Sequence, residues 1–373
     1  MSNADVLARL ALSHLVEPAN ERIGRALLDH QADEVVAQMT RGRGHRLGLA
    51  DLQERWDGRD CVASAQREWQ QAEQLGVDLI VPGSLGWPTQ LDDLAATAPL
   101  VLRSKGSIPI RQSAARSVAI VGARAATRYG CAVADELAAT LAGRGWCVVS
   151  GAAFGIDAAA HFGALAGGGQ TIAISAAGVD RPAPVANSGL FQRIYASGAV
   201  LSEVPLGARP NRSRFLVRNR LIAALTRAVV VVEAAMKSGA RSTAAQASAL
   251  GRIVAAVPGP ITSAMSVGCH SLIREQQAVL VSSPAEVVEL LAPVQTALDI
   301  NGPTAGAQSD CRDVLGVLEA DRPAGVDALG QLVGLSAPRT LAALCLLEQS
   351  GGAWRDRDGW RAANWGRGPL GSG

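Results

Sequence analysis

The stretch Ala228-Val229-Val230-Val231-Val232 decides the fold class, because five consecutive apolar residues, four of them β-branched, predict a strand buried on both faces. Five similar runs flank it, at 118–121, 147–149, 171–174, 199–201 and 253–257. The six runs begin roughly 24 to 30 residues apart, and helical patterns lie between several of them. Strands and helices alternating at this spacing predict βαβ units and therefore a six-stranded, doubly wound parallel sheet over residues 110–290.

The regions on either side of this domain have different patterns. Residues 1–75 show short amphipathic segments, which predict a small helical (SAM-like) domain, and a connecting segment at 76–109 includes a short strand at 77–81. Residues 291–309 are rich in Pro, Gly, Ala, Thr and Gln and predict a linker. Three helix-length segments and a hairpin in 310–365 predict a winged helix. Its expected recognition helix carries one cation, Arg339, so we expect it to contact protein rather than DNA.

Composition excludes several classes of protein. The 373 residues are 48% hydrophobic, too apolar for a mainly disordered chain. No apolar run is long enough for a membrane span, and the acidic residues near the start argue against a secretory signal. The six cysteines are scattered without a CxxC pair, so neither a metal site nor a disulfide framework is predicted. We therefore expect a cytoplasmic protein.

Positive charge is concentrated in one segment. Residues 209–252 contain nine basic residues and one acidic residue, Glu233, which gives +8 in a chain whose net charge is only +2. Such a concentration favours a polyanionic partner. The alternative is an ordinary solvated face.

Four loops follow predicted strands, at 122–127, 150–157, 209–220 and 237–243. In a doubly wound sheet, ligands bind at this carboxyl edge, and loops rich in glycine and hydroxyl residues suit phosphate oxygens. The candidate phosphate-loop glycines are Gly122, Gly151 and Gly155. The alternative is that these glycines only permit tight turns. The loop that begins at Gly122 lacks the GxGxxG spacing of dinucleotide binding, and GxxxxGK[ST] does not occur, so no nucleotide cofactor is predicted.

The loop at 209–220 has the most specific composition. It holds five arginines, with Phe215 and Asn219 among them. Single-stranded nucleic acid is bound by cations for its phosphates and by flat side chains for its bases. The alternative places Phe215 in the core. Asp157 and His161 have the spacing of an acid–base pair, but we favour a loop-ordering aspartate and a packed histidine, and predict no catalytic residue.

These loops together resemble the DprA/Smf family of DNA-processing proteins, with the likeness strongest over residues 70–290. The matching segments are Ala119-Ile-Val-Gly-Ala-Arg124, Ser150-Gly-Ala-Ala-Phe-Gly-Ile-Asp157, Ser202-Glu-Val-Pro-Leu-Gly207, Arg218-Asn-Arg220, Ser238-Gly239 and Val257-Pro-Gly259. The sequence departs from the family pattern at Ala176, Ala183, Leu216 and His270.

The resemblance implies an extended Rossmann-like domain that binds single-stranded DNA without cutting it, forms a homodimer and delivers the DNA to the recombinase RecA. By position it assigns DNA contacts to Arg124, Phe215, Arg218, Asn219, Arg220, Ser238, Gly239 and Thr243. Charge and proximity in sequence add Arg212, Arg214, Lys237 and Arg241.

Two other functions stay open at this point. One is a nucleotide-binding enzyme or sensor of the related fold, although the Pro-Gly-Gly-x-Gly-Thr-x-x-Glu loop of proteins resembling the cytokinin-activating hydrolases is absent. The other is a protein-interaction scaffold that acts through the winged helix.

Overall fold

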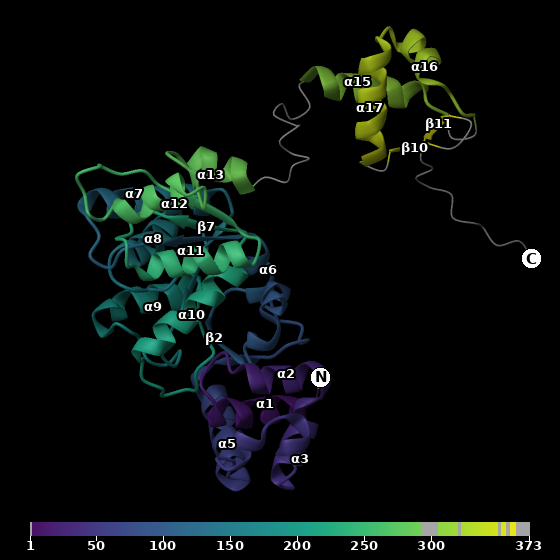
Figure 1. Ribbon diagram of the computed structural model, residues 1–373. Helices are drawn as coiled ribbons and strands as arrows, with labels where there is room; N and C mark the ends of the chain where they lie inside the picture. Colours follow the sequence, from purple (N-terminus) through teal and green to yellow (C-terminus); the bar gives the residue numbers. More distant parts are fainter. Residues whose placement is uncertain (1, 292–304, 320–321, 350–351, 356–358, 363–373) are drawn as a thin grey trace, which may run out of the picture. The chain divides into compact units, whose positions relative to one another are not determined.

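A computed structural model describes residues 2–291, 305–319, 322–349, 352–355 and 359–362 (Figure 1). The chain divides into two compact units, Met1–Leu291 and Ala292–Gly373, and each is considered by itself. The predicted linker at 291–309 falls mostly on residues 292–304, which lie outside the described residues.

A single sheet organises the first unit. Its order is β1-β2-β6-β5-β4-β3-β7-β8-β9, with β3 to β9 parallel and with β1 and β2 antiparallel at one edge. The strands are β1 (Asp78–Ile80), β2 (Leu102–Gly106), β3 (Ser117–Val121), β4 (Cys147–Ser150), β5 (Thr171–Ile174), β6 (Ala199–Ser202), β7 (Ala228–Val231), β8 (Ile253–Ala256) and β9 (Val279–Leu280). The six predicted strands and the short strand near residue 78 are confirmed. The sequence patterns missed β2, which is polar, and β9, which has two residues.

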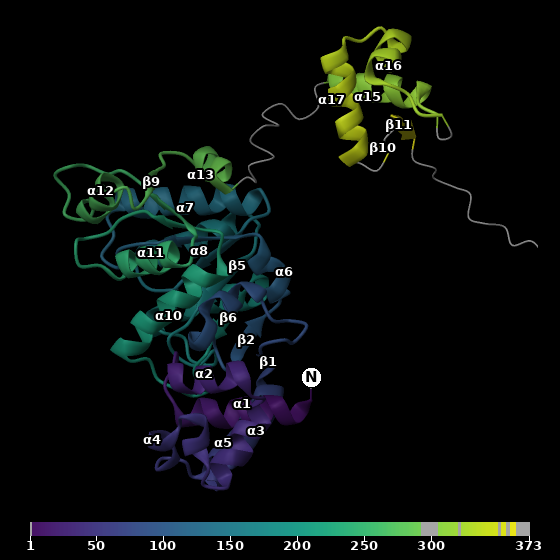
Figure 2. The same cartoon turned by 45° about the vertical axis from the view of Figure 1, so that its right-hand side comes forward.

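Helices cover both faces of the sheet, which confirms the doubly wound, Rossmann-like prediction (Figures 1 and 2). The valines of β7 alternate, since Val229 and Val231 pack in one apolar layer and Val230 and Val232 in the other. The first layer is covered by α6 (Ile110–Ala115), α10 (Arg212–Leu225), α11 (Gly239–Ala249) and α12 (Val267–Arg274), and the second by α7 (Arg128–Gly143), α8 (Ile156–Ala166) and α13 (Pro284–Leu291). Helix α9 (Ser188–Ser197) packs on β5 and β6.

The first five helices pack together beside β1 and β2 (Figure 2). They are α1 (Asn3–Leu15), α2 (Glu21–Asp29), α3 (Ala32–Thr40), α4 (Ala50–Gln53) and α5 (Gly58–Leu75). Their ends follow capping rules: Asp57 accepts hydrogen bonds from the first N–H groups of α5, and Gly76 closes that helix with φ 62°. These helices form part of the same compact unit as the sheet.

A buried ion pair joins the helices to the sheet. The Arg103 guanidinium on β2 is fully buried and donates 2.9 and 2.8 Å hydrogen bonds to the two carboxylate oxygens of Glu68 on α5. Burial alone would raise the pKa of Glu68, but hydrogen bonds from His14 and Arg103, the Arg103 charge and the Leu206 N–H together lower it to about 2. The carboxylate therefore stays charged where Arg103 needs a counter-charge.

The second unit has the predicted order of three helices and a hairpin. These are α15 (Ala305–Val317), α16 (Val326–Val333), α17 (Ala337–Gln349), β10 (Ala353–Arg355) and its antiparallel partner β11 (Trp360–Ala362). Their small core includes Val314, Leu329, Leu344 and Trp360. Assignment as a winged helix stays a prediction. In the described parts of the chain, no single helix is long and apolar enough to cross a membrane, and α16 and α17 pass that test only as a pair bent by 103°.

Candidate nucleic-acid interface

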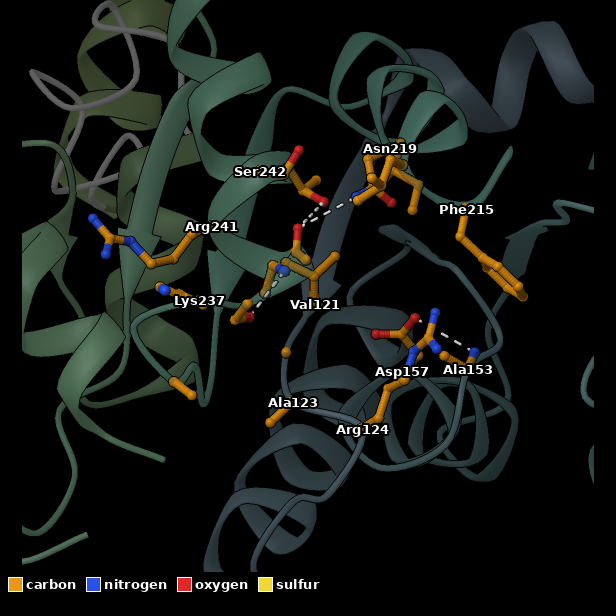
Figure 3. Close-up of a pocket in the computed structure, with 18 of the residues that line it drawn as sticks. Val121, Ala123, Arg124, Ala153, Asp157, Phe215, Asn219, Lys237, Arg241 and Ser242 are labelled. Carbon is orange, nitrogen blue, oxygen red and sulfur yellow. Dashed lines mark hydrogen bonds between the residues drawn. The ribbon is translucent and has the colours of Figure 1, made fainter. Parts of the chain in front are cut away.

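A cavity of about 1100 Å³, here called the main cavity, opens at the carboxyl edge of the sheet (Figure 3). It is formed by the loops after β3 and β7 together with the first turns of α10 and α11. Eleven of the fifteen predicted site residues line it: Gly122, Arg124, Arg212, Phe215, Arg218, Asn219, Lys237, Ser238, Gly239, Arg241 and Thr243. The other four are Gly151, Gly155, Arg214 and Arg220, whose places are described below.

Three exposed cations lie around this cavity. Arg124, Arg212 and Lys237 form no ion pair with any described acidic residue. Arg241 is half-buried, donates a 3.1 Å hydrogen bond to the Met236 carbonyl and lies 3.9 Å from Glu275. The cavity therefore presents unneutralised positive charge to solvent, which attracts anions.

Phe215 supplies a flat apolar surface in the same cavity. It is half-buried on α10, and the Arg124 guanidinium lies 4.7 Å from its ring centroid (Figure 3). This cation–π contact holds the two planar groups together. Because Phe215 lines the cavity, the alternative that places it in the core is wrong.

The phase of helix α10 decides which of its residues reach the cavity. Asn211 caps the helix by accepting a 2.8 Å hydrogen bond from the Arg214 N–H. Arg212, Phe215, Leu216 and Asn219 follow at i, i+3, i+4 and i+7, which places them on one helical face, and all four line the cavity. The exposed Leu216 was noted only as a departure from the family pattern; this helical spacing could have identified it as a site residue.

Two predicted arginines lie on other faces of α10. Arg214 donates two 2.7 Å hydrogen bonds to Glu17. Arg220 is buried and donates 2.5 and 2.6 Å hydrogen bonds to Glu203 and a 2.8 Å bond to the Thr97 carbonyl. Both guanidinium groups are neutralised by acids from distant parts of the chain. Arg214 and Arg220 therefore hold α10 in place.

Arg218 forms the floor of the main cavity. Its guanidinium is buried and donates to the carbonyl of Gly151, at 2.8 Å, and to that of Ile174, so it joins the ends of β4 and β5 to α10. Burial lowers the pKa of Arg218 to about 10, although the charge of Asp157 opposes the shift. It remains cationic at neutral pH, and its Nε has no hydrogen-bond partner among the residues that the structure describes.

Close packing explains the candidate phosphate-loop glycines. A Cβ on Gly151 would lie 2.4 Å from the Arg218 guanidinium. Gly155 has φ +74°, and a Cβ there would lie 2.3 Å from the Ala123 carbonyl oxygen. A Cβ on Gly122 would collide with Ile156. These positions therefore need glycine for turn geometry and close approach, and only Gly122 also lines the cavity.

Side-chain hydrogen bonds organise the start of α11 at the opposite wall. Ser238 caps the helix by accepting a 3.1 Å hydrogen bond from the Ala240 N–H. Asn219 and Thr243 donate to the Gly239 carbonyl at 3.3 and 3.4 Å. The helix N-terminus thus faces the cavity in a fixed position, and its dipole favours an anion there (Figure 3).

The Asp157–His161 pair is buried, and of the two only Asp157 lines the main cavity. His161 is fully buried, and its Nδ1 lies 2.7 Å from Thr171 Oγ1, whose own proton goes to the Val148 carbonyl. Burial, reinforced by the Arg218 charge, lowers the pKa of His161 to about 3, so the ring is neutral. Asp157 accepts a 3.4 Å hydrogen bond from the Ala153 N–H, in line with a loop-ordering role. In the described part of the chain, no group of three or more His, Cys, Asp or Glu side chains is placed to hold a metal.

Comparison with known proteins identifies the family. The model of the DNA recombination-mediator protein A family matches residues 78–292, more than half of the chain. The chain belongs to this family. The resemblance to DprA/Smf proteins is thereby confirmed.

Relatives extend this similarity. The putative DNA processing protein DprA of Mycobacterium tuberculosis is 46% identical over 277 residues, which cover 73% of this chain and 70% of that protein. The crystal structure of DprA from Streptococcus pneumoniae superposes with a TM-score of 0.62 at 32% identity, covering 77% of this chain and 97% of that one. A Helicobacter pylori DprA structure, described for its single-stranded DNA binding mode, has a TM-score of 0.52 at 29% identity. The match covers 58% of this chain and 95% of that one.

The two kinds of arginine in this DprA-family chain should respond differently to truncation. Arg220→Ala leaves the buried Glu203 carboxylate without its counter-charge, so we expect the free energy of unfolding to fall by about 3–5 kcal/mol. Arg212→Ala removes an exposed, unpaired cation and should change the free energy of unfolding by about 0.5 kcal/mol or less. Urea denaturation of both variants and the parent chain measures this difference. Equal stability of the two variants would contradict the structural role of Arg220.

Proposed function

We propose that this chain binds single-stranded DNA in the main cavity and does not cut it. The observation that carries the proposal is the group of unpaired cations, Arg124, Arg212 and Lys237, around the accessible ring of Phe215. Cations suit the phosphates of a nucleic-acid backbone, and the ring suits the face of a base. Similarity to the Helicobacter pylori DprA, a protein with a single-stranded DNA binding mode, supports this choice of ligand.

Single strands fit this cavity better than duplex DNA. The ring of Phe215 is half-buried and lies among loops, so a base must leave a stacked duplex to reach it. Bases of single strands are already free to turn outward. Phosphate contacts carry no sequence information, and the cations contact the backbone, so binding should be largely independent of sequence.

Binding without chemistry is the second part of the proposal. Of the acid–base pair that the sequence offers, Asp157 lines the main cavity, but His161 is fully buried, does not line the cavity and is neutral. A hydrolytic site needs a base within hydrogen-bond reach of its substrate. We therefore assign this pair to ordering the loop below the cavity. The rival function, a nucleotide-binding enzyme or sensor, predicts instead that the folded protein binds small nucleotides and not single strands.

Fluorescence anisotropy with a labelled single strand tests the proposal. Arg124, Arg212, Lys237 and the half-buried Arg241 together should give a slope of log affinity against log salt concentration of about −3. Substituting Arg124, Arg212 and Lys237 by alanine together should reduce that slope by about 2 and weaken binding to all sequences alike. A matched control replaces Arg41, Arg43 and Arg46, three exposed arginines of the N-terminal helices, and should behave like the parent chain. No binding of single strands by the folded parent protein would overturn the proposal, and small nucleotides would be screened instead.

We further propose that the chain forms a homodimer through its Rossmann-like domain. The last strand of the sheet, β9, lies at an edge, and its residues Val279 and Leu280 are 50% and 48% exposed. An exposed strand edge with apolar side chains favours pairing with another chain. Light scattering should give twice the 38.4 kDa chain mass. A mass of one chain at micromolar concentration would contradict the dimer.

The most specific proposal is that the protein loads RecA onto single-stranded DNA in the cytoplasm, during natural transformation or recombination. It rests on the family resemblance and on the proposed DNA binding. On DNA already covered by single-strand-binding protein, RecA should hydrolyse ATP after a shorter lag when this chain is present. The variant lacking the Arg124, Arg212 and Lys237 cations should not shorten the lag. An unchanged lag with the parent protein would exclude loading.

A further inference from the structure

A second cavity, of about 700 Å³, lies at the same edge of the sheet. It is formed by the loop after β5 and the segment that leads into α10. Its lining residues are Asp180, Arg181, Pro182, Ala183, Pro184, Val185, Arg209 and Pro210. Pro210 also lines the main cavity, so the two cavities share a wall.

The charges of the second cavity favour an anion. Arg181 and Arg209 are exposed, and neither forms an ion pair with a described acidic residue. The opposing charge comes from Asp180, whose carboxylate accepts 2.9 and 3.1 Å hydrogen bonds from the Gly207 N–H. That carboxylate is therefore engaged with the backbone, while both guanidinium groups remain available to a ligand.

The walls of the second cavity are fixed before any ligand arrives. The Gly178 N–H donates a 3.0 Å hydrogen bond to the Ala208 carbonyl, which ties the two loops together. Arg214 donates to the Arg209 carbonyl at 2.9 Å and is itself held by Glu17. Three prolines and Val185, which is 79% exposed, give an apolar surface. A preformed apolar wall with cations at its rim suits a nucleotide, which combines an apolar base face with an anionic phosphate.

We propose that a single strand bound in the main cavity continues through the second cavity, where Arg181 and Arg209 bind its phosphates. This inference rests on the proposed DNA binding. The shared wall at Pro210 favours a continuous strand as the occupant, because Arg212 lines the main cavity and Arg209 and Arg181 line the second cavity on the other side of that wall. Its volume of about 700 Å³ falls within the ~300–1,000 Å³ that is usual for small-ligand pockets.

Strand length separates the two cavities experimentally. The full chain and its R181A/R209A variant are titrated with oligothymidylates of about four and about twelve nucleotides. Both strands fill the main cavity, but only the longer one reaches the second. We expect the variant to bind the short strand as the parent does, within about twofold, and the long strand about tenfold more weakly, with a salt slope smaller by about 1.4. The matched control, R41A/R43A, removes two exposed charges from the N-terminal helices and should retain the full affinity for both strands.

A second measurement does not depend on charge. Two twelve-nucleotide strands are prepared, one with a photoreactive thymine at the 5′ end and one with it at the 3′ end. Only one of the two should cross-link to the peptide containing residues 180–185, and a labelled four-nucleotide strand should not reach that peptide. The proposal would be overturned if the R181A/R209A variant lost affinity equally for both strand lengths. It would also be overturned if the variant lost no affinity for either length and no cross-link formed. Both results would leave DNA binding in the main cavity intact. Failure of the parent chain to bind any single strand would overturn both.

Discussion

The buried guanidinium of Arg218 is the interaction on which the binding edge depends. It contacts the carbonyl groups at the ends of β4 and β5 from a position on α10, so three separate segments share one cation. A buried charge is costly unless it is paired and hydrogen-bonded; Asp157 and the two carbonyls offset part of that cost, and burial still lowers the pKa of Arg218 to about 10. The absence of a side chain at Gly151 follows from this arrangement, and the Arg218 charge adds to the burial that lowers the pKa of His161 and keeps it neutral. The exposed cations Arg124, Arg212 and Lys237 therefore surround a cavity floor, formed by Arg218, that is already positively charged and held by hydrogen bonds.

Arginine has two separate uses in this chain, and the count of charges along the sequence does not distinguish them. Within residues 209–252, Arg214, Arg220 and Arg252 pair with Glu17, Glu203 and Asp93. All three acids lie outside the segment whose charge is +8, so the excess at the surface is smaller than the sequence suggests. The planar guanidinium, with five donors, can join a carboxylate and several carbonyls at once, which explains why a chain with two lysines uses arginine for both purposes.

The parallel strands β3 to β8 were predictable because each is a short apolar run at regular spacing, and both faces of β7 are buried, as the run of valines at 229–232 indicates. The loops of the site were predictable because parallel strands bring their carboxyl ends to one edge. The roles of Arg214 and Arg220 were not predictable from composition, since they depend on helix phase and on acids that lie 197 and 17 positions away along the chain, respectively. The second cavity was missed because its prolines and Val185 carry no motif. Only the pairing of the loops after β5 and β6 brings Arg181 near Arg209.

Strand order explains why the main cavity lies where it does. The sheet runs β6-β5-β4-β3-β7-β8, so the chain leaves β3 toward β4 on one side and later returns to place β7 on the other. The loops after β3 and β7 therefore diverge and leave a crevice between neighbouring strands, the position at which doubly wound sheets bind ligands. Arg124 enters from the first loop and Lys237 from the second, and Arg212 of α10 lines the same cavity. Under the proposed DNA binding, a single strand in this crevice would lie across the carboxyl ends of successive strands rather than along any one of them. Its phosphates would then meet a cation from each loop in turn, and in this way the proposed site would accommodate an extended polymer.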